Sequence, residues 1–170
     1  MKWDKGLDFE ETYKTLLKSI YDNEKPQDII LLIQLRNGSR IGEAVAAAKE
    51  YCRTKSREVT VEVEKGGGYL EGNKRFMVMP EEVPNALLNM VCEWLSKVTD
   101  PTTAVKVWAK RKYGWNTHSL RYAFITHLLA LGYSPIFISK ITGHRSLRNL
   151  SEYAEITKAE EILKSLRGKK

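Results

Sequence analysis

Residues 59–79 read VTVEVEKGGGYLEGNKRFMVM, and this stretch decides the fold class because its hydrophobic period differs from that of its surroundings. Across residues 59–63 valine alternates with polar side chains, which is the pattern of a half-buried β-strand. Three glycines at 66–68 interrupt the strand, and residues 75–79 supply a partner strand. The stretch therefore predicts a β-hairpin with a flexible turn.

Both flanks of the hairpin carry apolar residues at helical spacing, and many of the segment ends have typical capping residues. Helices are predicted at residues 8–20, 28–36, 40–51, 86–95, 101–114, 117–131, 135–142, 147–154 and 158–166. Thr117 is expected to cap its helix, and Thr157 with Glu160 to form a capping box for the last one. The predicted fold is mainly α with a small antiparallel β-sheet, in the α+β class.

The 170 residues have the composition of one soluble globular domain, with 42% hydrophobic and 29% charged residues. The longest strongly apolar stretch, residues 29–35, contains a glutamine and is too short to cross a bilayer about 30 Å thick. Residues 1–6 lack the apolar core of a signal peptide. Cys52 and Cys92 have no metal-binding spacing. We therefore expect a cytoplasmic protein with free thiols and no membrane partner.

The charge balance is basic, with 28 Lys and Arg residues against 21 Asp and Glu residues and a net charge of +7. A basic protein attracts nucleic acid because binding releases condensed counterions. A Lys-rich solvated surface accounts for the same number equally well. The charge alone leaves both interpretations open.

The sequence gives little support for a nucleotide-binding loop or a metal site. The glycines at 66–68 lack the Lys-Ser/Thr pair of a P-loop and do not open a helix, so a hairpin turn is the better interpretation. The three histidines and two cysteines show no paired ligand spacing. The acidic pairs at 81–82 and 160–161 lie at expected helix starts, where negative charge is favourable in itself. No metal and no cofactor is expected.

The segment that begins at His118 is a stronger candidate for chemistry. His118 and Arg121 are three residues apart on a predicted helix, so imidazole and guanidinium share a face and can bind one anion. His127 follows nine residues after His118, which places it about 180° away on the opposite face. We therefore expect His127 to be a packing or surface residue.

Further polar residues extend this pair into an ordered set. Arg40 begins a predicted helix, and Glu43 three residues later is positioned to hold its guanidinium by a charge-assisted hydrogen bond. Lys65 ends the first predicted strand. His144 follows the glycine that ends a predicted helix, and Tyr153 comes nine residues later. The order along the chain is Arg, Lys, His-x-x-Arg, His and Tyr.

Three motifs carry a family resemblance: GSRIGE at 38–43, THSLRY at 117–122, and GHRS at 143–146 followed by Tyr153. In this order they resemble the catalytic domain of the tyrosine recombinases, the lambda-integrase family of site-specific DNA recombinases. The resemblance extends from about residue 29 to residue 156. It implies an integrase or resolving enzyme of a virus, plasmid or chromosome.

The resemblance implies that double-stranded DNA is cleaved and rejoined through a covalent intermediate, without metal or ATP. Tyr153 would be the nucleophile that forms a 3′-phosphotyrosyl link. Arg40 and Arg121 would bind the non-bridging phosphate oxygens, whose charge grows in the transition state.

Proton transfer is assigned by the same resemblance. His118 and His144 would hydrogen-bond the phosphate or move the proton of the nucleophile. Lys65 would protonate the leaving 5′ oxygen. The turn after it is longer than is usual in the family, and Lys74 begins the return strand. Lys65 is preferred because of its distance from Arg40, and Lys74 remains the alternative general acid.

The resemblance also bears on domain organisation. Complete family members carry an N-terminal helical domain that clamps DNA, and the residues before 29 are too few to form it. Residues 1–170 are therefore interpreted as a single catalytic domain, either excised or minimal. The helix and basic tail at 157–170 would pack on their own domain or on a neighbouring protomer. Self-association into a dimer or tetramer on DNA is expected.

Two other functions fit parts of the pattern. One is a DNA-binding regulator that kept the fold and lost the chemistry. The other is an enzyme similar to type IB topoisomerases, which relaxes supercoils as a monomer. The complete ordered set favours the recombinase, and the expected location is the cytoplasm, that of the host cell if a virus or plasmid encodes the chain.

Overall fold

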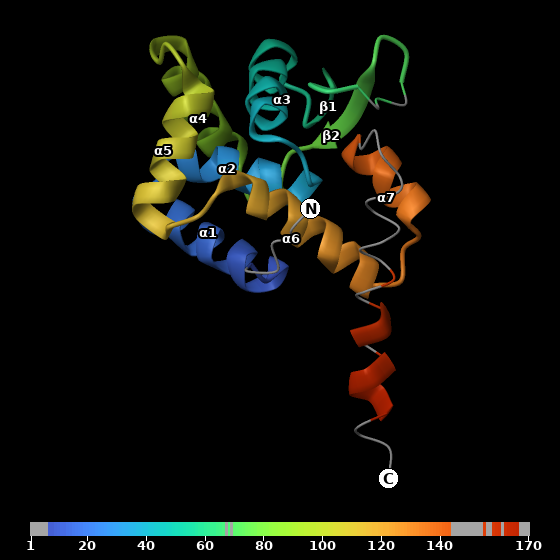
Figure 1. The fold of residues 1–170 in the computed structure, drawn as a ribbon. Helices are drawn as coiled ribbons and strands as arrows, with labels where there is room; N and C mark the ends of the chain where they lie inside the picture. Colours follow the sequence, from blue (N-terminus) through green and yellow to red (C-terminus); the bar gives the residue numbers. More distant parts are fainter. Residues whose placement is uncertain are drawn as a thin grey trace.

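One helix, α2 (Pro26–Asn37), lies at the centre of the fold in the computed structural model, which describes residues 7–66, 68, 70–143, 155, 158–160 and 162–166 (Figure 1). It packs against α1 (Phe9–Asn23), α3 (Ile41–Thr54), α4 (Asn85–Lys97), α5 (Pro101–Tyr113) and α6 (Thr117–Ala130). Residues 29–33 are fully buried because five consecutive apolar side chains cover every side of a helix with 3.6 residues per turn. Even so, none of the described helices is long and apolar enough to span a membrane.

The predicted hairpin is present as β1 (Glu58–Glu62) and β2 (Lys74–Val78), paired antiparallel beside α3 and α7 (Pro135–Thr142) (Figure 1). Val59 and Val61 are buried, as their alternation predicts. The register pairs Val61 with Arg75, so β2 buries an arginine completely and leaves the neighbouring Phe76 41% exposed. The prediction of a mainly α fold with a small antiparallel sheet is confirmed.

Most helix ends fall where capping residues predicted them. Gly114 and Gly143 end α5 and α7 in the left-handed conformation, with φ of 74° and 70°. The predicted cap of α6 was wrong by one residue, because the side chain of Asn116 accepts the hydrogen bond from the His118 backbone N–H at 3.0 Å. Thr117 is therefore the first residue of the helix. The predicted helix at 147–154 and Thr157 lie outside the described residues.

The expectation of free thiols was also wrong, because Cys52 of α3 and Cys92 of α4 form a disulfide. Although they are 40 residues apart in the sequence, their Cα atoms lie 5.6 Å apart, which is well within the range of a disulfide. A cross-link that closes a loop of this length removes freedom from the unfolded chain and stabilises the fold by about 4 kcal/mol.

The described residues near the C-terminus, 158–160 and 162–166, are helical and lead away from the rest of the molecule (Figure 1). Ile162, Leu163 and Leu166 are 51%, 71% and 59% exposed. These apolar side chains are therefore largely uncovered in a single copy of the chain.

Candidate active site

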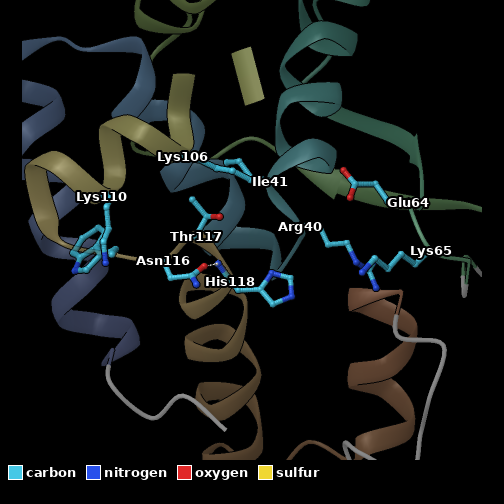
Figure 2. A pocket seen from close by; sticks show the side chains of 10 residues that line it. Arg40, Ile41, Glu64, Lys65, Lys106, Lys110, Asn116, Thr117 and His118 are labelled. Atoms are coloured by element: carbon cyan, nitrogen blue, oxygen red, sulfur yellow. Dashed lines mark hydrogen bonds between the residues drawn. The ribbon is translucent and has the colours of Figure 1, made fainter. Parts of the chain in front are cut away.

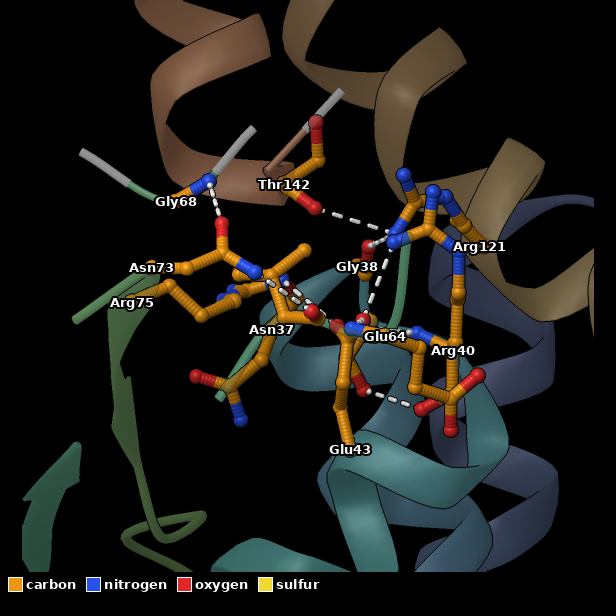
Figure 3. A network of polar contacts seen from close by, with 12 residues as sticks. Asn37, Gly38, Arg40, Glu43, Glu64, Gly68, Asn73, Arg75, Arg121 and Thr142 are labelled. Carbon is orange, nitrogen blue, oxygen red and sulfur yellow. Dashed lines mark hydrogen bonds and ion pairs between the residues drawn. The ribbon is translucent and has the colours of Figure 1, made fainter. Parts of the chain in front are cut away.

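The junction between α2 and α3 positions Arg40. Buried side chains donate hydrogen bonds to the backbone of this junction (Figure 3). Three successive carbonyl groups of the junction accept hydrogen bonds. The donors are Arg75 Nη2 to Asn37 (2.6 Å), Arg121 Nη1 to Gly38 (3.3 Å) and Gln34 Nε2 to Ser39 (3.0 Å). At Gly38 φ is +61°, and a Cβ would lie 2.1 Å from the ring of Phe124, so this position requires glycine. The backbone that precedes Arg40 is thereby fixed.

The side chain of Glu43 holds Arg40 in place, as the spacing predicted. Its Oε2 accepts a hydrogen bond from Arg40 Nη1 at 2.9 Å, and the carboxylate is fully buried. The same oxygen accepts from the Glu64 backbone N–H at 3.3 Å, which ties the end of the first strand to α3. Oε1 lies 3.7 Å from Arg75 Nη1. One buried carboxylate thus orients two arginines.

Arg121 lies on α6 behind Arg40 and is only 2% exposed. Its Nη1 donates to the carbonyl oxygens of Gly38 and Thr142, the latter at 3.0 Å, which connects α6 to the end of α7. Burial, followed by repulsion from Arg40, lowers the pKa of Arg121 to about 9. The positive charge here is therefore held at an energetic cost, which an anion would relieve.

Arg40 also borders a cavity of about 490 Å³ between α3, α5, α6 and the hairpin (Figure 2). The charged side chains that line it, together with the imidazole, are Arg40, Lys65, Lys106, Lys110, Glu64 and His118. Four cations face one carboxylate in this lining. In Figure 2 the side chains of Arg40 and Lys65 converge near the ring of His118. Such a cavity suits a tetrahedral oxyanion such as a phosphodiester.

His118 lies beside this charge, and its pKa is lowered by desolvation, then by Arg121, Arg40, Lys65 and Lys106 in that order. The lowered pKa favours the neutral imidazole near pH 7, which has one donor and one acceptor nitrogen. The edge of the ring meets Tyr122 at a centroid distance of 5.6 Å, which restrains its orientation. His118 can therefore either donate to an anion or accept a proton.

The two candidate lysines lie in different surroundings. Lys65 lines the cavity with Arg40, whereas Lys74 is exposed, pairs with Glu62 in the sheet register and does not line the cavity. His144 and Tyr153 lie outside the described residues. The continuously described range 70–143 ends one residue after Thr142, whose carbonyl accepts the hydrogen bond from Arg121.

His127 behaves as the helical spacing predicted. Its ring stacks on Phe9 with a centroid distance of 4.2 Å, and it lines a separate cavity with Tyr13 and Leu128. It takes no part in the cluster around Arg121.

Sequence reasoning missed four residues around the site: Gln34, Arg75, Lys106 and Lys110. The two lysines had a usable signal, because they are four residues apart on the helix before the His-x-x-Arg motif. Arg75 was assigned only as part of a strand, although its alternation with Met77 places both on the buried face. Nothing local singles out Gln34.

Comparison with known proteins gives relatives over nearly the whole chain, although no family model matches it. "Putative integrase ORF241" of Acidianus two-tailed virus is 39% identical over 176 residues, which covers 96% of this chain and 68% of the relative. "Tyrosine recombinase XerA" of Pyrococcus furiosus is 25% identical over 170 residues, which covers 87% of this chain and 56% of the relative.

A solved structure agrees with these relatives at the level of the fold. The crystal structure of XerA recombinase superposes with a TM-score of 0.59 at 18% identity. The match covers 95% of this chain and 63% of that chain, so this chain spans less than two thirds of the solved protein. The relatives, the shared fold and the ordered motifs agree, and the chain belongs to the tyrosine recombinase family and corresponds to its catalytic domain.

Proposed function

We propose that this chain is the catalytic domain of a site-specific recombinase that cleaves and rejoins double-stranded DNA through a covalent tyrosyl intermediate. One observation carries the proposal. Arg40, Arg75 and Arg121 gather around the single carboxylate of Glu43, next to a cavity that four cations line. The cations that line this cavity attract an anion, and a DNA phosphate supplies that anion.

In the proposed reaction the Tyr153 oxygen attacks phosphorus, and a 3′-phosphotyrosyl bond forms as the bond to the 5′ oxygen breaks. Arg40 and Arg121 bind the non-bridging oxygens, where negative charge grows in the transition state. Attack by a 5′-hydroxyl of another strand on the phosphotyrosine reverses the step and exchanges strands. ATP is unnecessary because the energy of the phosphodiester is kept in the covalent link, and the guanidinium groups provide the charge stabilisation that a metal would otherwise supply.

Lys65 is the proposed general acid that protonates the leaving 5′ oxygen. It lines the same cavity as Arg40 and His118, whereas Lys74 does not. His118 and His144 are proposed to hydrogen-bond the phosphate or to accept the proton of the nucleophile. The neutral form of His118, which its lowered pKa favours, suits the acceptor role.

The proposal includes self-association on DNA. The exposed Ile162, Leu163 and Leu166 form an apolar helix face, and we propose that this face docks on a neighbouring protomer when two or four copies assemble. The proposed place of action is the cytoplasm, that of the host for a viral or plasmid protein. A disulfide is compatible with this location in hyperthermophilic archaea, whose intracellular proteins are rich in disulfides.

The first test is incubation with nicked suicide DNA substrates in EDTA, followed by denaturing electrophoresis. We expect a protein–DNA adduct that survives denaturant and is lost in Tyr153→Phe. An adduct that persists in Tyr153→Phe would move the nucleophile elsewhere, and strict Mg²⁺ dependence would indicate a nuclease. Tight binding without an adduct would indicate a regulator, and efficient relaxation of supercoiled DNA by the monomer would indicate a type IB topoisomerase.

The second test separates the two lysines. Lys65→Ala should slow cleavage of normal DNA and recover on a substrate whose leaving group is a 5′-thiolate, because that group departs without a proton donor. Lys74→Ala is the matched control and should cleave both substrates at the wild-type rate. The opposite pattern would assign the general acid to Lys74.

A further inference from the structure

Gln34 is a buried residue of α2 that touches both halves of the candidate site. Its side chain is fully buried, and its Nε2 donates two hydrogen bonds. One goes to the Ser39 carbonyl at 3.0 Å, and the other to the Thr117 carbonyl at 2.9 Å, across 83 residues of sequence. A single amide group therefore joins the start of α3 to the start of α6.

Both accepting carbonyls are directly followed in the chain by a site residue. Ser39 precedes Arg40, and Thr117 precedes His118. The two hydrogen bonds of Gln34 thus hold these two backbones together directly beside Arg40 and His118, next to the bond from Arg121 Nη1 to the Gly38 carbonyl. Arg121, one turn further along α6, is carried by the same helix start.

The orientation of the amide is fixed by its partners. Nε2 is the donor of the group, so a reversed amide would point its oxygen at two carbonyl oxygens. In the arrangement observed, Oε1 is buried and has no hydrogen-bond partner among the described residues. A buried acceptor without a partner costs free energy, and an apolar side chain of the same volume would avoid that cost. The amide is therefore better explained by the geometry that it imposes than by stability.

We propose that Gln34 is a positioning residue, which sets the separation of Arg40 from His118 and Arg121 around the reacting phosphate. The inference rests on the proposed function, because it concerns the geometry of that reaction. Rates of oriented reactions are sensitive to displacements of about 1 Å, which alone cost about 100-fold. Loss of the two hydrogen bonds should therefore impair the use of the guanidinium groups before it impairs DNA binding.

The test compares two substrates in single-turnover adduct formation at saturating DNA. One has the normal phosphodiester at the cleavage position, and the other a methylphosphonate, which lacks the negative charge that the arginines stabilise. In Gln34→Met, which keeps the volume and removes both donors, we expect the phosphodiester rate to fall about 10- to 100-fold. The methylphosphonate rate should fall less than about threefold, and the Kd for DNA should stay within about threefold.

Two controls make the result specific. Arg40→Ala should reproduce the selective loss on the phosphodiester, because it removes a guanidinium directly. Leu16→Ala, in the buried core on α1, lowers stability without touching the junction, and its two rates should change in parallel. If Gln34→Met is too unstable to assay, Gln34→Asn keeps the amide but shortens its reach and should show the same selectivity.

The outcomes are distinct. Parallel loss on both substrates in Gln34→Met, or unchanged rates on both, would overturn the inference. Failure of both Gln34 variants to fold would assign the residue to folding and overturn it as well. An absence of adduct with the wild-type chain would instead overturn the proposed function.

Discussion

The two buried carboxylates Asp28 and Glu43 differ in the number of cations around them. Asp28 of α2 is fully buried and pairs with one cation, Lys112, at 3.1 Å. Neutral groups complete its shell at 2.6–2.8 Å, and they are Ser19, Trp108 and Tyr113. The ammonium of Lys112 lies 5.0 and 5.2 Å from the ring centroids of Trp108 and Tyr113. The positive charge of Lys112 therefore balances the negative charge of Asp28, and the cluster is neutral.

Glu43 faces three guanidinium groups, Arg40, Arg75 and Arg121, and the cluster adjoins a cavity. Adding the lining of that cavity widens the imbalance, since Lys65, Lys106 and Lys110 outnumber Glu64. Structural ion pairs tend toward neutrality, as at Asp28, because an unmatched buried charge is costly. The difference indicates that the Asp28 cluster serves the fold, whereas the excess of cations in the cavity beside Glu43 supports the proposal that an anion binds there.

The largest effect on stability is expected at the neutral cluster. Asp28→Ala removes the acceptor of four buried or half-buried donors and strands the charge of Lys112, so the free energy of unfolding should fall by about 3–5 kcal/mol. Urea unfolding measures this loss. The rate of adduct formation by the folded fraction should stay within about twofold of wild type. A specific loss of rate in this variant would break the distinction between the two clusters.

At the charged cluster the expectation is reversed. Arg121→Met should slow adduct formation about 10²- to 10³-fold, because one preorganised donor to the transition state is lost. Its unfolding free energy should fall by less than that of Asp28→Ala, because removal of a desolvated and repelled charge partly offsets the loss of the hydrogen bonds to the Gly38 and Thr142 carbonyls. Single-turnover kinetics and urea unfolding on the same preparation give both numbers. A large destabilisation would mean that Arg121 is structural in the way that Asp28 is.

Lys106 and Lys110 should contribute to affinity and little to chemistry. If each contacts a DNA phosphate, then Lys106→Gln with Lys110→Gln reduces the slope of log Kd against log salt by about 2. Lys14→Gln with Lys18→Gln, also four residues apart but on α1, removes the same charge as a control. Equal salt slopes in the two double variants would mean that only the net charge matters and that Lys106 and Lys110 make no specific phosphate contacts.

The smallest effect concerns His118, whose pKa is lowered by burial and then by the surrounding cations. Arg40→Met should raise the pKa of His118 toward its ordinary value, and NMR titration of the ring measures the shift. Because the folded state holds the lower pKa, protonation favours the unfolded state, and stability should decline as the pH falls below about 6.5. His118→Gln should remove that part of the decline. A pKa insensitive to Arg40 would separate the imidazole from the cluster.

Local signals predicted the elements of this fold well. The bounds of α7, residues 135–142, follow from a serine cap, a proline at the first position and a terminal glycine, all readable within ten residues. The shift of the α6 cap from Thr117 to Asn116 shows the limit of such signals, since both residue types cap helices. Valine alternation found β1 equally well.

Contacts between distant segments escaped the sequence because they depend on packing. The disulfide joins residues 40 apart, Arg75 reaches Asn37 across 38 residues, and Gln34 reaches Thr117 across 83. Within the described residues, the structure brings Arg40, Lys65 and His118 to one cavity, although they were selected from local spacing and motif order without any view of their contacts. The roles of His144 and Tyr153 stay predictions from that order.

Because a disulfide joins α3 to α4, the thermal stability of the protein depends on whether the solution is reducing or oxidising. Arg40 is the N-cap of α3, and Cys52 in the last turns of the same helix forms the disulfide. A batch purified with dithiothreitol and one purified in air would hold the same charges yet melt at different temperatures. The activity measured above ambient temperature would then depend on the fraction of molecules with an intact disulfide, so the oxidation state of the cysteines must be fixed before the assay.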